Sequence, residues 1–528
     1  MLFVYFLTFM AENLKPIRTR FAPSPTGYVH VGNFRTALFS HLWARHNGGV
    51  SVLRIEDTDQ SRKVDGAVEH LLRIMKTMGV EFDEGYYLKD DGSLAERGEV
   101  GPYLQSERLD LYKSHVDQLL AAKKAYYCFC SEERLAEVRK EQMALKKPPM
   151  YDRHCHSLSD DELQAKQKEF QEAGKNPVVR FAIPEGKTEI HDLIYGDIVY
   201  ENSVLDDQVI LKSDGFPTYH LAVVVDDHFM EITHVIRGEE WIPSTPKHIL
   251  LYQAFGWKAP AFAHAPLILN PDKSKLSKRQ GDVTVEDYLQ KGYLPEALVN
   301  FVAFLGWNPK TEQEIFSMEG LVEAFDLSKV NKSGAVFDVN KLDWINGQYL
   351  RAMPTGELVD LLIPFWKSDD YGIFDEQGNV TLPIASKQLS KQYLIDIVEL
   401  EKERLKKLSE IGERTPYFFR EPDANGVKEL LVAKKSTPEA TKQGLAALVD
   451  QLSNYTVDDF EITILETKVK NMISEKGLQN IDVLWPMRVA LTGMSASPSP
   501  FEVASVLGKH MGTEAVIGRL NSAIASIS

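Results

Sequence analysis

The chain has 528 residues, of which 44% are hydrophobic and 26% charged, a balance typical of a soluble globular protein with three or more domains. The net charge of −16 excludes a protein coated in basic surface, although one basic face is enough to bind nucleic acid. The 3 cysteines are too few for a disulfide-stapled scaffold, and we expect a reducing, cytoplasmic compartment.

The apolar start of the chain, Met1–Met10, is too short to span a bilayer and has no basic leader. We therefore expect neither a membrane association nor a signal peptide. Residues 1–16 are predicted to be a tail, and Met10 is an alternative start.

The first folded elements predict an α/β unit. From Ile17 the residues I-R-T-R-F alternate as in a half-buried strand, and a Pro/Gly loop follows as far as Gly27. Apolar residues then recur at helical spacing until two glycines end the helix. Val50–Ile55 is predicted to be a buried strand that ends at Glu56. Such a strand–loop–helix–strand unit opens a doubly wound sheet, which binds ligands at the carboxyl ends of its strands.

The remaining chain divides into regions of different character. Residues 110–205 are rich in Lys, Glu and Gln and are predicted to be a helical and irregular insertion. From Leu294 onward, amphipathic helix patterns dominate. The expected domains are a tail at 1–16, a Rossmann-type domain at 17–109 and 206–290, an insertion at 110–205, a connecting region at 291–340 and a helical region at 341–528.

Two short segments carry the chemistry. The first is R-F-A-P-S-P-T-G-Y-V-H-V-G at Arg20–Gly32, where His30 at the helix entrance can donate a hydrogen bond to a phosphate. The second is K-L-S-K-R at Lys275–Arg279, which places cations around Ser277. Lysine ammonium groups of this kind can neutralise the charge that develops on a leaving pyrophosphate.

Three charged side chains lie at predicted strand ends. Arg20 and Arg237 provide guanidinium forks, which suit bidentate binding of carboxylates, and Glu56 can bind an ammonium group. Tyr219 and Ser24 add hydroxyl groups. All are predicted to face one crevice.

Together the two segments resemble the signature pair of class I aminoacyl-tRNA synthetases, and their surroundings resemble bacterial-type glutamyl-tRNA synthetases from about Ile17 to Arg519. The resemblance implies ATP-dependent formation of glutamyl-adenylate, with Mg²⁺, and transfer to the 3′ end of tRNA(Glu). It implies catalytic roles for His30, Lys275 and Lys278, and glutamate contacts at Arg20, Ala22, Ser24, Glu56, Tyr219 and Arg237. It implies ATP contacts at Pro23, Thr26, Gly27, His30, Gly32, Glu240, Ser277 and Lys278.

The cysteines lie in one window, as C-F-C at Cys128 and Cys130 and then Cys155. Clustered thiolates suit Zn²⁺, but a C-x-C pair is tighter than the usual spacing. A structural zinc site and a group of buried thiols without metal therefore both remain open. The candidates for a fourth ligand are Tyr151, His154 and His156.

The C-terminal half resembles the stem-contact and anticodon-binding regions of the same family, and Arg404 falls near the position that inspects the third anticodon base. Unstacked bases would be bound there by arginine hydrogen bonds and stacking. Three alternatives are less favoured: a relative that glutamylates a tRNA base, a glutaminyl ligase with a β-barrel tail, and a non-catalytic paralogue. Nothing in the sequence requires more than a monomer.

Overall fold

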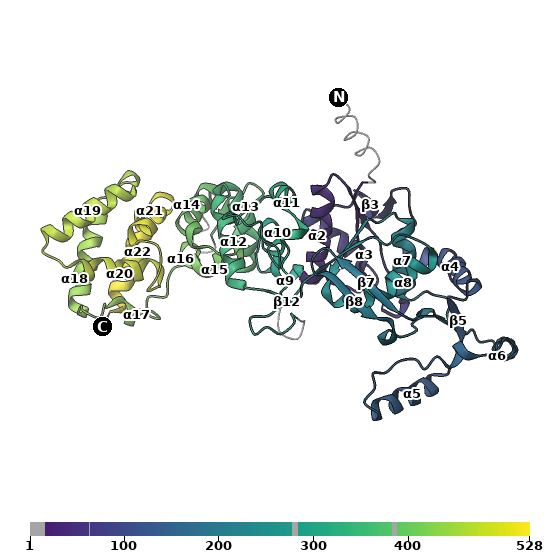
Figure 1. Cartoon of the computed structure of the whole chain (residues 1–528). Helices are drawn as coiled ribbons and strands as arrows, with labels where there is room; N and C mark the ends of the chain where they lie inside the picture. The colour runs from purple at the N-terminus through teal and green to yellow at the C-terminus, as the bar shows by residue number, and fades with distance from the viewer. Residues whose placement is uncertain (1–15, 63, 277–282, 383–387, 528) are drawn as a thin grey trace. The chain divides into compact units, whose positions relative to one another are not determined.

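The protein is described here by a computed structural model covering residues 16–62, 64–276, 283–382 and 388–527. The chain forms two compact units (Figure 1). Unit 1 is Met1–Gln290 with Pro295–Leu342, and unit 2 is Lys291–Leu294 with Asp343–Ser528. In the described ranges, no helix combines the length and the apolar character needed to cross a bilayer.

Unit 1 is built on an eight-stranded sheet in the order β4–β3–β2–β1–β10–β11–β7–β8. Neighbouring strands from β3 to β7 in this order run parallel, whereas β4 and β8 add antiparallel edges. The predicted doubly wound α/β fold is therefore confirmed. The strands are β1 Arg18–Phe21, β2 Val50–Leu53, β3 Glu84–Leu88, β4 Leu94–Arg97, β7 Lys187–Asp192, β8 Gly196–Glu201, β10 His234–Gly238 and β11 Ala261–Ala265.

Helices cover both faces of this sheet, as the side chains of β1 show. Thr19 Oγ1 donates to the carbonyl of Ser40 on α2, while Arg18 Nε donates to the carbonyl of Met230 at the end of α7. Because successive side chains of a strand point to opposite faces, α2 and α7 lie on opposite sides of the sheet. The helices of unit 1 are α2 Val31–His46, α3 Ala67–Thr77, α4 Leu109–Ala121, α5 Glu132–Ala144, α6 Asp160–Glu172, α7 Tyr219–Phe229, α8 Thr245–Phe255, α9 Val285–Gln290, α10 Pro295–Ala303 and α11 Met318–Ala324.

The region 110–205 contains more strand than the sequence predicts. Helices α4, α5 and α6 are present, but β5 (Ala125–Cys128) and β6 (Val178–Phe181) form an antiparallel sheet with β9 (Val209–Leu211), which lies just after the region. The hairpin β7–β8 joins the main sheet beside β11. The expectation of a helical and irregular insertion is wrong in this respect. In β7 only alternate residues are buried, and the residues on the exposed face are polar. The strand therefore has the polar composition of a loop and cannot be recognised from composition.

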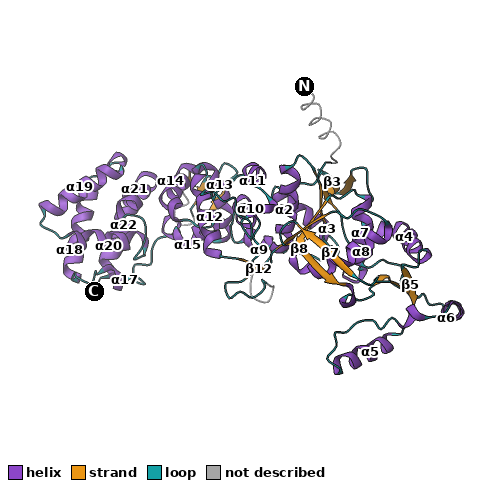
Figure 2. Ribbon diagram, in the orientation of Figure 1, coloured by secondary structure: helices purple, strands orange, loops and turns teal. Residues whose placement is uncertain are grey.

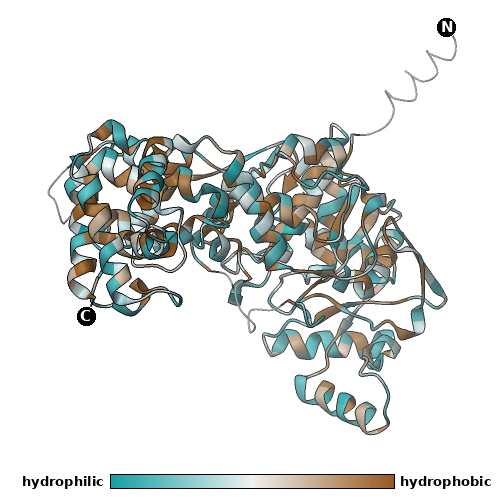
Figure 3. Cartoon of the chain, turned by 90° about the vertical axis from the view of Figure 1, so that its left-hand side faces the viewer, coloured by the Kyte–Doolittle hydropathy of each residue, from teal (hydrophilic) through white to brown (hydrophobic). Residues whose placement is uncertain are grey.

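Unit 2 is mainly helical, as predicted (Figure 2). Apolar and polar residues alternate along its helices, which is the pattern of amphipathic helices around a shared core (Figure 3). A small antiparallel sheet, β14 Ile373–Phe374 with β15 Val380–Thr381 and β16 Gln388–Leu389, interrupts them. The longer helices are α13 Thr355–Ser368, α14 Lys391–Glu401, α18 Pro438–Leu452, α19 Ile462–Glu475, α20 Asn480–Thr492, α21 Pro500–Met511 and α22 Thr513–Ser526, and α12 Val339–Ala352 spans the boundary with unit 1.

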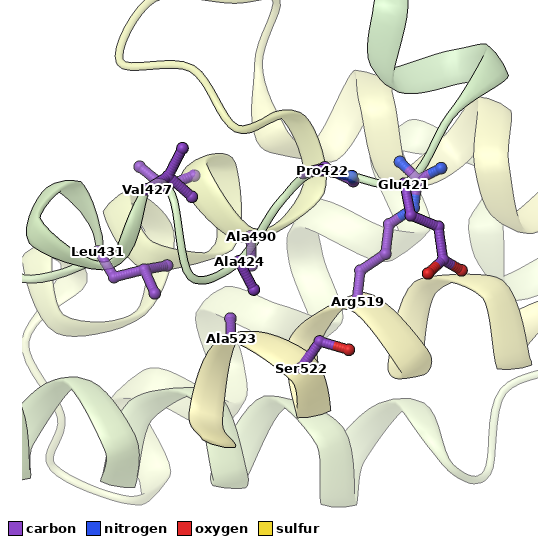
Figure 4. A pocket seen from close by; sticks show the side chains of 10 residues that line it. Glu421, Pro422, Ala424, Val427, Leu431, Ala490, Arg519, Ser522 and Ala523 are labelled. Atoms are coloured by element: carbon purple, nitrogen blue, oxygen red, sulfur yellow. The ribbon is translucent and has the colours of Figure 1, made fainter. Parts of the chain in front are cut away.

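One cavity inside unit 2 is too small to hold a ligand. It lies among Val427, Leu431, Ala490 and Ala523, with Arg519 at its edge (Figure 4), and its volume is ≈ 10 Å³. A cavity of about this size holds at most one water molecule.

Candidate active site

Unit 1 contains a pocket of ≈ 550 Å³. Arg20 lies next to the last residue of β1, Glu56 follows β2 and Arg237 lies on β10, so the pocket opens at the carboxyl ends of neighbouring parallel strands. The residues predicted from sequence that line it are Arg20, Ala22, Pro23, Ser24, Thr26, His30, Gly32, Glu56, Tyr219, Arg237, Glu240 and Lys275. The structure thus brings the predicted amino-acid and nucleotide residues into one pocket.

Some of the predicted residues are placed differently. Gly27 is not among the lining residues, and its φ of 111° indicates a turn that glycine adopts without steric cost. Tyr219 begins helix α7 and does not lie at a strand end. Ser277 and Lys278 lie outside the described residues. Lys275 is described, is exposed, and pairs with Leu269 in an isolated bridge at the rim of the pocket.

His30 is fixed at the start of α2. Its Nδ1 accepts a hydrogen bond from the Gly32 amide at 3.0 Å, so the imidazole caps the helix. The Val31 amide donates to the Val283 carbonyl, and the Val285 amide donates to the Val29 carbonyl. These bonds hold the His30 segment against the chain that follows Lys275. Because amide groups at a helix N-terminus attract anions, the ring lies where a phosphate can bind.

A buried charge network orients Arg20 and Glu56. Arg20 Nε donates to Asp227 at 3.3 Å, and Arg54 Nη1 donates to the same carboxylate at 2.7 Å. Arg54 Nη2 donates to Glu56 at 3.0 Å. Burial raises the pKa of the Glu56 carboxyl, and the charges of Arg54 and Arg20 oppose this rise. The pocket therefore presents the carboxylate of Glu56, which is held by Arg54, and the guanidinium of Arg20, which is held by Asp227.

Three buried charged residues beside the pocket were not predicted from the sequence, namely Arg54, Asp226 and Asp227. Arg54 is fully buried, and Asp226 also accepts a hydrogen bond from Arg108 Nε at 2.7 Å. One signal was available, because an arginine inside the apolar strand run V-L-R-I needs a charged partner. The sequence could not show that the partner lies 173 positions away, on α7.

Arg237 provides a second guanidinium group to the pocket. Its Nη1 donates to the Tyr219 hydroxyl at 3.0 Å, and the Tyr219 ring packs against Trp241 with centroids 4.6 Å apart. Burial lowers the pKa of the Arg237 guanidinium. Two guanidinium groups, one carboxylate and an aromatic hydroxyl thus surround a space open to solvent, which complements a small zwitterion with an additional carboxylate.

The cysteines meet in the insertion, remote in sequence from the pocket residues. The sulfur atoms of Cys128, Cys130 and Cys155 all lie within 4.8 Å of one another, and the last two are 3.6 Å apart. The Tyr151 hydroxyl lies 3.4 Å from both Cys128 Sγ and Cys130 Sγ. Two thiolates bound tetrahedrally at about 2.3 Å would be separated by roughly 3.8 Å, so the sulfur arrangement fits a zinc ion.

Tyr151 is the best placed of the predicted fourth ligands. His154 and His156 are exposed, whereas Tyr151 is buried among the thiols. The guanidinium of Arg180 lies 4.0 Å from the centre of the Tyr151 ring, and Arg134 Nη1 donates to Cys130 Sγ at 3.4 Å. Hydrogen bonds from Cys155, Tyr151 and Arg180 lower the pKa of the Cys128 thiol, which favours the thiolate form that a metal requires.

Unit 2 has a hollow of its own, of ≈ 450 Å³, with Trp485, Arg488 and Phe501 in its lining. Arg488 Nη1 donates to the Ser497 carbonyl at 2.6 Å, which fixes the side chain. Arg404 lies elsewhere in unit 2, with half of its side chain exposed and Glu401 4.0 Å away. An aromatic ring beside an arginine is a common way to bind an unstacked base.

Comparison with known proteins identifies relatives of both units. Residues 16–344 match the family model of the catalytic domain of class I tRNA synthetases (E and Q), and residues 357–524 match an anticodon-binding domain. The chain is 45% identical over 498 residues to a glutamate–tRNA ligase of Clostridioides difficile, covering 94% of this chain and 97% of the relative. It is 46% identical over 503 residues to one from Alkaliphilus metalliredigens, with the same coverage.

A solved structure has the same fold. The glutamate tRNA ligase of Elizabethkingia meningosepticum, crystallised in complex with its amino acid, matches with a TM-score of 0.84 at 34% identity. The match covers 97% of this chain and 100% of that one.

Proposed function

The chain belongs to the glutamate–tRNA ligases, within the class I tRNA synthetases, and we propose that its unit 1 pocket activates L-glutamate with ATP and transfers it to tRNA(Glu). One observation carries the assignment of the site. Arg20, Arg237 and Glu56 share a single pocket with His30 and Lys275, so the amino acid and the nucleotide can meet there. An adenylate can form only where a carboxylate oxygen reaches the α-phosphorus.

The reaction has two steps. A carboxylate oxygen of glutamate attacks the α-phosphorus of ATP, the bond to the bridging oxygen breaks, and pyrophosphate leaves. A ribose hydroxyl at the 3′ end of the tRNA then attacks the activated carbonyl carbon, and AMP leaves with the bonding electrons. Charge builds on phosphate oxygens in the first step, and positioned donors and cations stabilise it.

For this step we assign the phosphates to His30 and the N-terminus of α2, with Lys275 at the rim. Mg²⁺ would accompany the phosphates, because among the described residues the only cluster with metal-ligand spacing is that of the cysteines. Lys278 is assigned from the sequence to the leaving pyrophosphate. Lys278→Ala should greatly reduce adenylate formation and leave the affinity for tRNA nearly unchanged, and normal turnover would contradict the assignment.

The glutamate subsite uses the two arginines and Glu56. Glu56 would hold the ammonium group, while Arg20 and Arg237 would hold the carboxylates and the Tyr219 hydroxyl would add a hydrogen bond. Arg20 uses only its Nε for the hydrogen bonds found among the described residues, so its terminal nitrogens can form a bidentate fork. Glutamine lacks the second negative charge that these cations attract.

Recognition of tRNA is assigned to unit 2. The family match over residues 357–524 supports this assignment, and so does the hollow that contains Trp485 and Arg488. Arg404 is proposed to inspect the third anticodon base, since its exposed side chain is available to a ligand. If Arg404→Ala leaves selection between glutamate and glutamine tRNAs unchanged, this role is wrong.

The cysteine cluster is proposed to hold a structural zinc ion. Cys128, Cys130, Cys155 and Tyr151 would be its ligands. The ion would crosslink β5 to the segment that carries Cys155 and would take no part in the reaction. We further propose that the protein acts as a monomer in the cytoplasm, where thiols stay reduced.

The test is aminoacylation with labelled glutamate on purified glutamate and glutamine tRNAs in parallel. Charging of the glutamate tRNA alone would support a discriminating ligase and the anticodon-reading role of unit 2. Charging of both tRNAs would support the proposed reaction and contradict discrimination between the glutamate and glutamine tRNAs. If a folded protein charges neither, a base-modifying or non-catalytic role replaces the proposal.

A further inference from the structure

Arg237 differs from Arg20 and Arg54 in how its charge is balanced. Arg20 and Arg54 each lie against a carboxylate. Arg237 is only 5% exposed, yet across the described part of the chain it has no ion pair within 4.0 Å. Its donors are directed to neutral groups instead. A buried cation without a carboxylate partner is costly, and so the groups that surround it are informative.

The first neutral partner is His264, on the neighbouring strand β11. Arg237 and His264 are register partners in the parallel pair β10–β11, and Arg237 Nε donates to His264 Nε2 at 3.1 Å. Because a guanidinium can only donate, Nε2 must be unprotonated. The ring proton is therefore on Nδ1, which lies 2.6 Å from Asp192 Oδ2 and donates to it.

Asp192 is itself fixed at the end of β7. Its other oxygen accepts from the amides of Ile194 and Tyr195 at 2.9 and 2.8 Å, in the turn of the β7–β8 hairpin. Both Asp192 and His264 are essentially inaccessible to solvent. The turn thus orients the carboxylate, the carboxylate orients the imidazole, and the imidazole orients the guanidinium.

Other uncharged groups complete the surroundings of Arg237. Its Nη2 donates to Thr245 Oγ1 at 2.8 Å, and its Nη1 lies 3.4 Å from His248 Nδ1. His248 Nε2 in turn lies 3.0 Å from His220 Nδ1. Thr245 and His248 help to fix the direction of the guanidinium, and neither of them carries a negative charge that would neutralise it.

We propose that His264, oriented by Asp192, is a positioning residue that presents Arg237 as a fixed and uncompensated cation to a carboxylate of the substrate. This inference rests on the proposed function and adds a specificity element to it. A carboxylate in direct contact with Arg237 would compete with the substrate for the same donors. The imidazole of His264 lies between Arg237 and Asp192 and so removes that competition. The negative charge of Asp192 is thereby separated from Arg237 by the width of the ring.

The first test compares variants of His264 in aminoacylation. His264→Leu removes the acceptor and should raise the KM for glutamate about 10- to 100-fold, while kcat changes less than about threefold. His264→Gln keeps an acceptor near the position of Nε2 and should recover part of the loss. The KM for ATP should stay unchanged in both variants. A purely structural role would lower kcat and the unfolding temperature without this separation.

The matched control lies one residue from Asp192. His191 forms a hydrogen bond of 2.6 Å with Asp197 on the same hairpin. Both side chains are about four-fifths exposed, and the pair is not part of the chain of hydrogen bonds from Asp192 through His264 to Arg237. His191→Leu should leave the KM for glutamate at the value of the unmodified protein. If His264→Leu behaves like this control while remaining folded, the inference is wrong.

The second test needs no activity. In a ¹⁵N-histidine spectrum, the signals absent from His264→Gln should be those of a neutral ring protonated at Nδ1. A ring protonated at Nε2 would overturn the inference even if the protein charges tRNA normally. If the unmodified protein charges no tRNA with glutamate, the proposed function fails, and the tautomer still decides the geometry.

Discussion

Replacing Asp227 by asparagine removes the negative charge that lies between two arginines. In the folded protein this carboxylate accepts from Arg54 Nη1 at 2.7 Å and from Arg20 Nε at 3.3 Å, and it is 3% exposed. Asparagine keeps the shape and one acceptor oxygen. Arg54 would retain Glu56 at 3.0 Å and Asp226 at 3.6 Å, whereas Arg20 would lose its ion pair.

The magnitude follows from these contacts. Removing one partner of a buried pair costs about 3–5 kcal/mol, and the carbonyl oxygen left by asparagine together with the remaining partners of Arg54 should limit the loss to about 2–3 kcal/mol. Most of this loss should appear as a lower free energy of unfolding of unit 1. The part that concerns the orientation of Arg20 should raise the KM for glutamate about tenfold.

The assay combines urea unfolding, followed by tryptophan fluorescence, with aminoacylation kinetics. Asp197→Asn is the control, because its carboxylate is 82% exposed and such a pair contributes about 0–1 kcal/mol. If Asp227→Asn remains as stable as the control and its KM for glutamate is unchanged, Asp227 neither stabilises unit 1 nor orients Arg20. A loss of stability with normal KM would limit Asp227 to a structural role.

Further predictions concern specificity, metal content and pH. Of Arg20→Gln and Arg237→Gln, at least one should shift the ratio of glutamate to glutamine use toward glutamine, measured by charging with each amino acid; an unchanged ratio in both would contradict the subsite. Elemental analysis should find one zinc per chain, and Cys130→Ser should lose it and lower the unfolding temperature with little change in adenylate formation. The hydrogen bonds from Arg18 lower the pKa of Glu84 below its ordinary 4.5. The ionised Glu84 carboxylate should therefore stabilise the protein fully above pH 4.5, and this stabilisation should be lost as the pH falls through the lowered pKa. In Glu84→Gln, the unfolding midpoint measured between about pH 3 and 7 should depend less on pH.

The sequence by itself determined the local elements and the catalytic motif. The alternation before Phe21 and the helical spacing after Gly27 predict β1 and α2, and both are present. In a parallel sheet the polar residues that follow strands gather at one edge, so Arg20, Glu56 and Arg237 could be predicted to share a crevice before their geometry was known. The family resemblance rests on the same segments and is confirmed by the match over residues 16–344.

Only the tertiary structure decided which charges meet. Arg54 finds Asp227 across 173 positions, and His264 finds Asp192 across 72, because the order of the strands and the register of β10 and β11 place them together. The β7–β8 hairpin that carries Asp192 was expected to be irregular, and it joins the sheet through pairing with a distant strand. Local periodicity contains no information on such pairing, since the free energy that selects it comes from burying both partners in the same core.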